Sequence, residues 1–249
     1  MNLIERANVI LTRSLPIKTV RSNASTAVAS ITFDDFPKSA WTVAGAILAR
    51  HGAMATYYTA GRFCGQTEDG IEYYDQADLV ALRDAGHEIG CHSFAHDQAP
   101  RLNNCELNAD LDLNAAFMTG VLGAQDLPSY AYPYGASSPR TKARMARRFA
   151  TARGIRSGVN SGTIDLAQLK SIPLEARRWR PDEIDAAIDQ AVATRGWVIF
   201  FTHDVSQSPS PFGCTPAMLE HALERLARAR IEVLPVKHAM ARVVFGSHA

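Results

Sequence analysis

Two short clusters of polar residues in this sequence are of the types that bind a metal ion and activate water. His92 and His96 are four positions apart and directly follow the apolar run Ile89–Cys91. On a helix or a tight turn, that spacing brings both imidazoles to one side, where they can share a cation. Asp34 and Asp35 also directly follow an apolar run. Two imidazoles and one carboxylate would supply a metal site, which leaves the other carboxylate to act as a base.

The elements that must position these clusters alternate between strand and helix. Short apolar runs predict buried strands, and apolar residues at spacings of three and four predict helices. The predicted strands cover residues 27–33, 54–59, 87–91, 129–132, 154–159, 172–174, 197–201 and 231–234. The stretch 61–74 is predicted to be a long loop, either a cover for a cleft or plain surface. This alternation predicts a parallel α/β barrel or a doubly wound sheet.

Polar clusters fall at the carboxyl ends of four predicted strands. They are Asp34-Asp35, His92, Pro133-Tyr134-Gly135 and His203. In parallel α/β folds the carboxyl ends of the strands gather on one face, and active sites are built there. We therefore expect these residues to meet in one functional site.

The composition narrows the possible partners. The chain has 249 residues and a formal net charge of +1, which favours neither nucleic acid nor an anionic membrane. Four widely spaced cysteines without a CxxC pair indicate buried thiols. Residues 1–26 are predicted to be an N-terminal helix and linker, and 27–249 a single domain. The charged N-terminus lacks a long apolar stretch, which predicts a cytoplasmic protein without membrane insertion; the oligomeric state is left open.

The order of four motifs resembles the polysaccharide deacetylase family, which is the NodB-homology domain or carbohydrate esterase family four. The motifs are Thr-Phe-Asp-Asp at 32–35, His-Ser-x-x-His at 92–96, Tyr-Pro-Tyr-Gly at 132–135, and a late strand ending in His203-Asp204. The resemblance runs from about Ala27 to Leu234. It implies an α/β fold, a distorted (β/α) barrel with seven or eight mostly parallel strands. It also implies metal-dependent removal of acetyl groups from N-acetylated sugars of a poly- or oligosaccharide.

The resemblance further implies roles for single residues. Asp35, His92 and His96 resemble the metal ligands, Asp34 the general base, His203 the general acid, and the Tyr134 amide the oxyanion donor. The implied cofactor is one divalent ion, zinc first, with cobalt, nickel or manganese as alternatives. Amide hydrolysis needs activated water, a stabilised oxyanion and a protonated leaving amine, and these residue types supply all three. Ser93 and Pro133 are expected to support the loops that carry these groups.

One supporting position departs from the family pattern. Relatives often have an arginine two residues before the motif proline, and this chain has Ala131 there. A carboxylate beside another carboxylate is pushed toward protonation, so Asp34 needs a cationic partner. We predict that Arg153 or Arg156 reaches it from the neighbouring strand end. The alternative is that both arginines are solvated or bind substrate.

The partner of His203 and the exact substrate are left open by the sequence. The aspartate–tryptophan motif that positions this histidine in the family is not recognisable, and Asp165 and Glu175 are candidate replacements. Two other functions fit the residues. One is hydrolysis of a cyclic amide or ureide on the same fold, which the missing arginine favours. The other is a catalytically silent carbohydrate-binding module, which the retained metal-ligand and catalytic residue types argue against.

Overall fold

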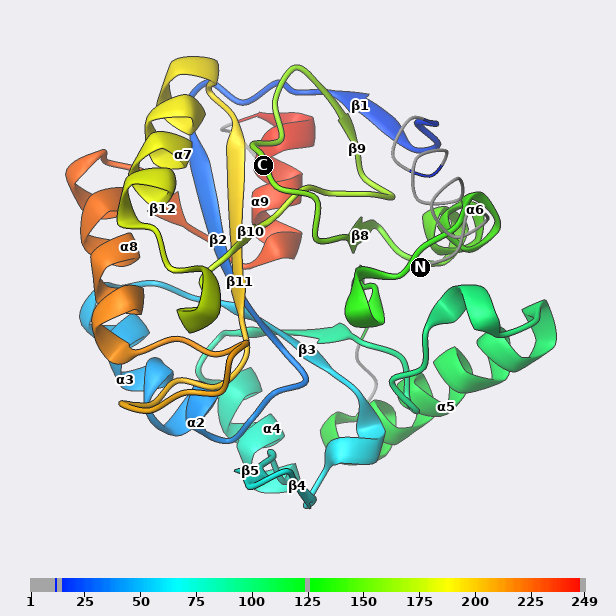
Figure 1. Cartoon of the computed structure of the whole chain (residues 1–249). Helices are drawn as coiled ribbons and strands as arrows, with labels where there is room; N and C mark the ends of the chain where they lie inside the picture. Colours follow the sequence, from blue (N-terminus) through cyan, green and yellow to red (C-terminus); the bar gives the residue numbers. More distant parts are fainter. Residues whose placement is uncertain (1–11, 13–14, 124–125, 247–249) are drawn as a thin grey trace.

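Strand β2, Val28–Asp34, is the centre of the main sheet, and all seven of its residues are buried. In the computed structural model, which describes residues 12, 15–123 and 126–246, β2 pairs in parallel with β11 (Trp197–Thr202) and β3 (Thr56–Thr59). The strand order is β10-β11-β2-β3-β6-β7-β8, and β12 pairs with the start of β2. This curled parallel sheet confirms the distorted α/β barrel (Figure 1).

The other elements are short strands and the helices that connect them. In the main sheet the remaining strands are β6 Glu88–Cys91, β7 Ser129–Ala131, β8 Thr151–Arg153, β10 Ile172–Pro173 and β12 Glu232–Val233. Two antiparallel pairs lie outside it: β1 Thr19–Arg21 with β9 Thr163–Asp165, and β4 Thr67–Glu68 with β5 Ile71–Glu72. The helices are α2 Ser39–Thr42, α3 Ala44–Arg50, α4 Gln76–Asp84, α5 Asn104–Leu122, α6 Pro139–Arg148, α7 Pro181–Thr194, α8 Pro216–Arg228 and α9 Val236–Phe245. Single 3₁₀ turns cover Gly61–Phe63, Ala99–Arg101, Pro133–Gly135 and Ala176–Arg178.

One chain segment joins the two edges of the main sheet. The Ala152 N–H of β8 donates to the Leu166 carbonyl at 2.7 Å, and the Leu169 N–H donates back to the Ala152 carbonyl at 2.9 Å. A few residues later the same segment forms β10, which pairs with β11. The join brings β8 near β11, and the Arg153 guanidinium lies 5.0 Å from the centre of the Phe201 ring.

Helices cover the outside of the sheet and close one end of the barrel. Helix α8 contacts α3 and α7, and α4 contacts α5 (Figure 1). At the amino ends of the strands, the Val236 N–H donates to Thr56 Oγ1 and the Lys237 N–H donates to Glu88 Oε2, both at 2.8 Å, which seats α9 there. The carboxyl ends stay open for a site. None of the helices in the described ranges is long and apolar enough to cross a membrane.

Several elements differ from their sequence prediction. The prediction of a strand at 154–159 was wrong, because the strand is Thr151–Arg153. This strand ends in a buried arginine, which a search for apolar runs does not assign to a buried strand. The expected loop 61–74 contains the β4–β5 hairpin, and β1 lies within the expected N-terminal helix and linker. The helix expected at 2–15 falls outside the described residues, apart from its positions 12 and 15.

Candidate active site

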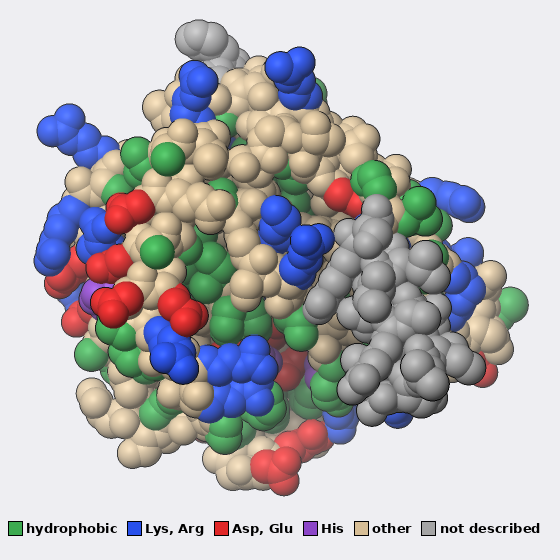
Figure 2. All heavy atoms as spheres, turned by 45° about the horizontal axis from the view of Figure 1, so that its top comes forward, with side chains coloured by type: hydrophobic (Ala, Val, Ile, Leu, Met, Phe, Trp, Pro, Cys, Tyr) green, Lys and Arg blue, Asp and Glu red, His purple; other side chains and the backbone are tan. Residues whose placement is uncertain are grey.

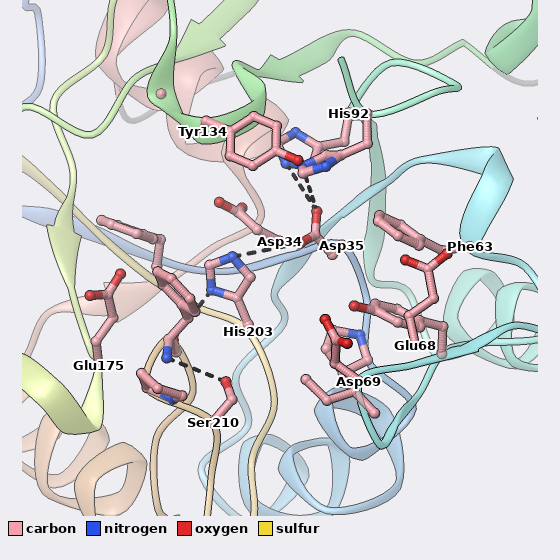
Figure 3. Close-up of a pocket in the computed structure, with 18 of the residues that line it drawn as sticks. Asp34, Asp35, Phe63, Glu68, Asp69, His92, Tyr134, Glu175, His203 and Ser210 are labelled. Carbon is pink, nitrogen blue, oxygen red and sulfur yellow. Dashed lines mark hydrogen bonds and ion pairs between the residues drawn. The ribbon is translucent and has the colours of Figure 1, made fainter. Parts of the chain in front are cut away.

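A cleft of about 580 Å³ opens at the carboxyl ends of the strands. It collects most of the residues singled out by the sequence, from elements far apart in the chain (Figure 3). These are Asp34, Asp35, His92, His96, Tyr134 and His203. On the face that Figure 2 shows, acidic and basic side chains lie among one another.

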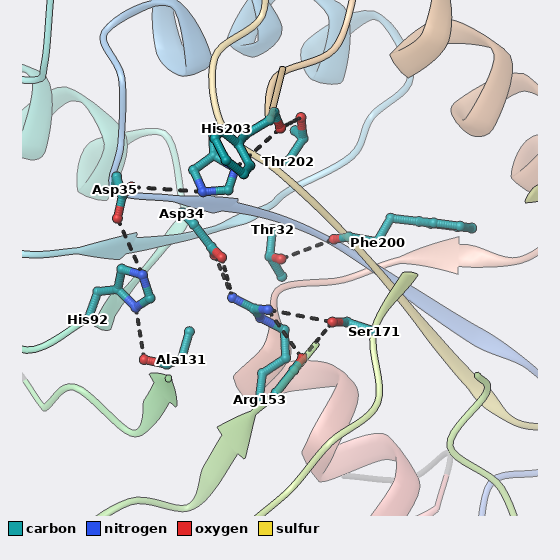
Figure 4. A network of polar contacts seen from close by, with 12 residues as sticks. Thr32, Asp34, Asp35, His92, Ala131, Arg153, Ser171, Phe200, Thr202 and His203 are labelled. Carbon is teal, nitrogen blue, oxygen red and sulfur yellow. Dashed lines mark hydrogen bonds and ion pairs between the residues drawn. The ribbon is translucent and has the colours of Figure 1, made fainter. Parts of the chain in front are cut away.

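The adjacent carboxylates of Asp34 and Asp35 enter the cleft in different directions because the backbone adopts the left-handed conformation at Asp35. Asp34 is the last residue of β2 and is buried, whereas Asp35 follows in the left-handed region with φ of 62°. Such a conformation costs free energy in a non-glycine residue and is found most often at functional sites. It turns Asp35 toward the histidines and leaves Asp34 facing the barrel interior (Figure 4).

Asp35, His92 and His96 form a cluster whose atoms suit a divalent cation. One ligand atom from each residue lies within 4.8 Å of the other two, and Asp35 Oδ1 is 3.3 Å from His92 Nε2 and 3.0 Å from His96 Nε2. His92 Nδ1 contacts the Ala131 carbonyl at 2.8 Å; donation of its proton there leaves Nε2 bare for a metal. Asp35 Oδ1 is buried without a hydrogen-bond donor among the described residues. Two imidazole nitrogens and a carboxylate oxygen are the usual ligands of a hydrolytic zinc site.

The charges in this cluster attract one another strongly. Burial raises the pKa of the Asp35 carboxyl, but its contacts with His92 and His96 outweigh burial and hold that pKa well below its usual value. Burial lowers the pKa of His92, and the nearby aspartates raise it above its usual value. A bound cation would replace protons on these groups, because histidine and carboxylate ligands bind metal in their deprotonated forms.

The loop that carries both histidines is fixed by a residue that the sequence analysis missed. Asp110 on α5 accepts hydrogen bonds from the backbone N–H groups of Phe94 at 2.9 Å and Ala95 at 2.8 Å. Ser93, expected to support the loop, has φ of 65° and its hydroxyl lies 3.3 Å from the Tyr130 hydroxyl. Asp110 is one of several acidic residues on α5, and nothing in its spacing separates it from the others. Only the tertiary contact identifies it.

Arg153 is the arginine that contacts Asp34. Its Nη2 donates to both Oδ1 and Oδ2 at 2.6 Å, so one nitrogen serves both carboxylate oxygens (Figure 4). Nη1 is held by the Gly154 carbonyl at 3.3 Å and by Ser171 Oγ at 3.5 Å. The guanidinium lies between the rings of Tyr58 and Phe201, at 5.3 and 5.0 Å from their centres.

The sheet register explains how this arginine reaches the base. Arg153 on β8 is the direct Cα partner of Ala131 on β7, the position where the family often has its arginine. Neighbouring strands are about 4.8 Å apart, a distance that the long arginine side chain can span. Arg156, the other candidate, lies beyond the strand and does not line the cleft.

His203 faces the metal-ligand cluster from the opposite wall of the cleft. Its Nε2 is 3.8 Å from Asp35 Oδ2, and its Nδ1 is 3.2 Å from the Phe212 carbonyl. The expectation that Asp165 or Glu175 orients this ring was wrong. Asp165 pairs with Lys142 at 2.7 Å and accepts N–H groups near residue 17, whereas Glu175 accepts from Arg177 Nε at 2.8 Å. A backbone carbonyl takes their place, and side-chain patterns in a sequence cannot reveal it.

The turn at Pro133–Gly135 places Tyr134 over the histidines. Tyr134 has φ of 58°, and its exposed ring lies 4.6 Å from the ring of His96. The hydrogen bonds of the turn run from the Gly135 N–H to Tyr132 and from the Ala136 N–H to Pro133. The Tyr134 N–H takes no part in them, which leaves it available to a ligand.

In parallel barrels active sites lie at the carboxyl ends of the strands, where this cluster is found. The family model for polysaccharide deacetylase matches residues 21–151, more than half of the sequence, and the chain belongs to that family. A chitin deacetylase from Pestalotiopsis sp. is 28% identical over 105 residues. The aligned part covers 42% of this chain and 33% of that protein, so the chain spans about a third of its length.

Solved structures share the fold at low sequence identity. A T48 deacetylase determined with substrate has a TM-score of 0.61 and 18% identity, over 88% of this chain and 93% of that one. A family 4 acetyl xylan esterase from Clostridium thermocellum, in complex with cobalt, has a TM-score of 0.59 and 18% identity. The match covers 86% of this chain and 90% of that one. A family 4 pseudoenzyme from Bacillus anthracis has a TM-score of 0.59 and 15% identity. The match covers 92% of this chain and 71% of that one. At these identities the likeness establishes the fold alone.

Proposed function

We propose that the protein removes acetyl groups from N-acetylated sugars of an oligo- or polysaccharide, with zinc held by Asp35, His92 and His96. The observation that carries this proposal is the Asp34–Arg153 pair beside the cluster of metal-ligand residues. The buried Arg153 guanidinium contacts both Asp34 oxygens at 2.6 Å and so holds this carboxylate in one orientation beside the cluster, as a positioned base requires. The glycan named for the similar chitin deacetylase belongs to this substrate class.

Each wall of the cleft contributes one step of amide hydrolysis. A divalent cation held by Asp35, His92 and His96 would supply Lewis acidity at this point of the cleft. Asp34 accepts the proton of the attacking water. The Tyr134 N–H donates to the oxyanion that develops on the carbonyl oxygen. His203, with Nδ1 directed at the Phe212 carbonyl, presents Nε2 to protonate the leaving amine.

The test is mass spectrometry of products from acetylated chito-oligosaccharides, with zinc and cobalt supplied separately. Asp34→Asn should retain metal and lose about 10²–10⁴-fold in rate, the usual contribution of a positioned base. His92→Ala and His96→Ala should lose bound metal. Asp112→Asn, which changes an exposed carboxylate of α5 outside the cleft, is the control and should stay near wild type. Near-normal turnover by Asp34→Asn would disprove the assignment of the base.

The same panel separates the two alternatives. The missing motif arginine was the argument for the hypothesis of cyclic-amide hydrolysis. Because Arg153 contacts Asp34, this argument no longer supports that hypothesis. Allantoin-like amides in the panel test it directly. A pseudoenzyme of the same family shares this fold, so bound metal with no turnover on any substrate would indicate a binding module instead.

A further inference from the structure

A second cavity, of about 350 Å³, lies beside the cleft and shares part of its wall. Arg177 and Arg178, on the 3₁₀ turn Ala176–Arg178, line both cavities. A ligand seated in the cleft can therefore extend past these two arginines into the second cavity. The other residues that line it are Ser157, Ile172, Pro173, Arg180, Glu183 and Ile184.

Each arginine of this cavity forms an ion pair with a glutamate through its Nε, Arg180 with Glu183 at 3.4 Å. Arg177 Nε donates to Glu175 Oε2 at 2.8 Å, Arg178 Nε lies 3.7 Å from the same oxygen, and the Glu175 side chain is 3% exposed. The Arg177 guanidinium also stacks on Phe212, 4.0 Å from the ring centre. In the described chain these ion pairs engage Nε and leave the paired terminal nitrogens of both guanidinium groups to a ligand. A fixed guanidinium loses less conformational entropy when it binds an anion.

The local charge is positive on this side of the cleft and negative on the other. Three arginines and one glutamate, Glu183, line the second cavity. The net charge of this group stays positive when the neighbouring Glu175 is included. The β4–β5 hairpin contributes Glu68 and Asp69 against Arg62 to the opposite wall (Figure 3). An acidic ligand would thus be attracted to one end of the cleft and repelled by the other.

We propose that the cavity formed by Arg177, Arg178 and Arg180 is a subsite for a carboxylate on a sugar that neighbours the N-acetylated sugar in an acidic glycan. The planar forks of arginine match the two oxygens of a carboxylate. The subsite deepens the proposed deacetylation and gives the glycan one direction across the cleft. Phosphate and sulfate esters are the other anions that sugars carry, so the test distinguishes them.

Binding is measured first, because it needs no turnover. Isothermal titration of an oligouronate without acetyl groups is compared with a neutral oligosaccharide of equal length and with sulfated and phosphorylated analogues. The Arg178→Gln/Arg180→Gln variant removes two side chains that are 59% and 71% exposed, so its fold should be intact. It should weaken oligouronate binding about tenfold, as expected for two partly exposed charges, and less so at high salt. Arg228→Gln, an exposed arginine of α8 outside both cavities, should change nothing.

Kinetics with partly acetylated acidic and neutral glycans complete the test. The double variant should raise KM for the acidic glycan about tenfold more than for the neutral one. Equal binding of oligouronate and neutral sugar, or no effect of the double variant, overturns the subsite. Preference for sulfated or phosphorylated sugars over the oligouronate overturns the carboxylate assignment. If the protein binds oligouronate but does not deacetylate, the proposed function alone is refuted. If it deacetylates acidic and neutral glycans equally well, the subsite alone is refuted.

Discussion

Replacement of Arg153 by Met tests whether the barrel needs this guanidinium to hold a charged base. The Arg153 side chain is 0% exposed and that of Asp34 is 7% exposed, so the pair is almost fully removed from water. Within the described residues, Arg153 is the basic side chain paired with Asp34. Methionine fills much of the same volume, so the main effect of the change is an unpaired carboxylate in the barrel.

The expected size follows from the burial of the pair. Removal of one member of a buried ion pair costs about 3–5 kcal/mol. In a chain of this size each kcal/mol lowers Tm by about 2–4 °C, so Arg153→Met should melt roughly 6–20 °C below wild type. The Asp34→Asn/Arg153→Met double variant should recover most of this loss, because it leaves no buried charge unpaired. Its activity should be no lower than that of Asp34→Asn alone, since the two residues act as one unit.

Thermal unfolding in chelator, followed by circular dichroism, gives the coupling of Asp34 and Arg153 in a double-mutant cycle. Arg156→Met is the control, because this second arginine lies three residues along the same segment, outside the cleft. A coupling below about 0.5 kcal/mol would refute the reasoning, since independent sites reach that value. Arg153→Lys should also fail to restore wild-type stability. It keeps the charge but loses the second arm of the guanidinium, which Gly154 and Ser171 hold.

Two further predictions concern the loop of the histidines and the acid limit of stability. Asp110→Ala should weaken metal binding about 10–100-fold, the usual effect of losing a group that orients ligands. Asp112→Ala, on the same helix, is the control and should not weaken it. Equal metal dissociation constants for the two variants would contradict the role of Asp110. Burial lowers the pKa of His87 to about 4, so the folded protein keeps this ring neutral while the unfolded chain takes up a proton below pH 6.5. Stability should therefore fall as pH drops from about 6.5 to 4, by about 1.4 kcal/mol per pH unit from this residue. Apo His87→Gln should show a shallower fall in chemical denaturation, and identical slopes would count against this account.

The parts of the fold that the sequence predicts are those with a strong local signal. β2 and β11 are runs of six or seven buried residues, and their hydropathy alone identifies them. β8 has three residues, too few for any period to show, and was not predicted at its place. The strand predicted at 172–174 is confirmed as β10, but its pairing with β11 depends on the segment that joins the barrel edges. The α9 helix was not predicted, because its buried face is set by the strand ends that it covers.

The site divides in the same way. The metal-ligand residue types, their spacing and their strand-end positions are visible in the sequence, and so is the need of Asp34 for a cationic partner. The choice between Arg153 and Arg156 is not visible, because it depends on which residue β8 pairs with Ala131. The partner of His203 is the backbone carbonyl of Phe212, which no side-chain pattern encodes.

The pairing of Ala131 with Arg153 bears on how enzymes are told from inactive relatives. A scan along the linear motif finds alanine where the arginine is expected and would count this chain among degenerate members. In this chain the guanidinium comes from the residue paired with Ala131 on the neighbouring strand, and it contacts Asp34. Two compensating substitutions suffice to transfer the arginine between these strands, one on each strand, without an insertion or a change of loop. A sequence of this fold that lacks the motif arginine should therefore be checked at the residue paired with that position on the neighbouring strand.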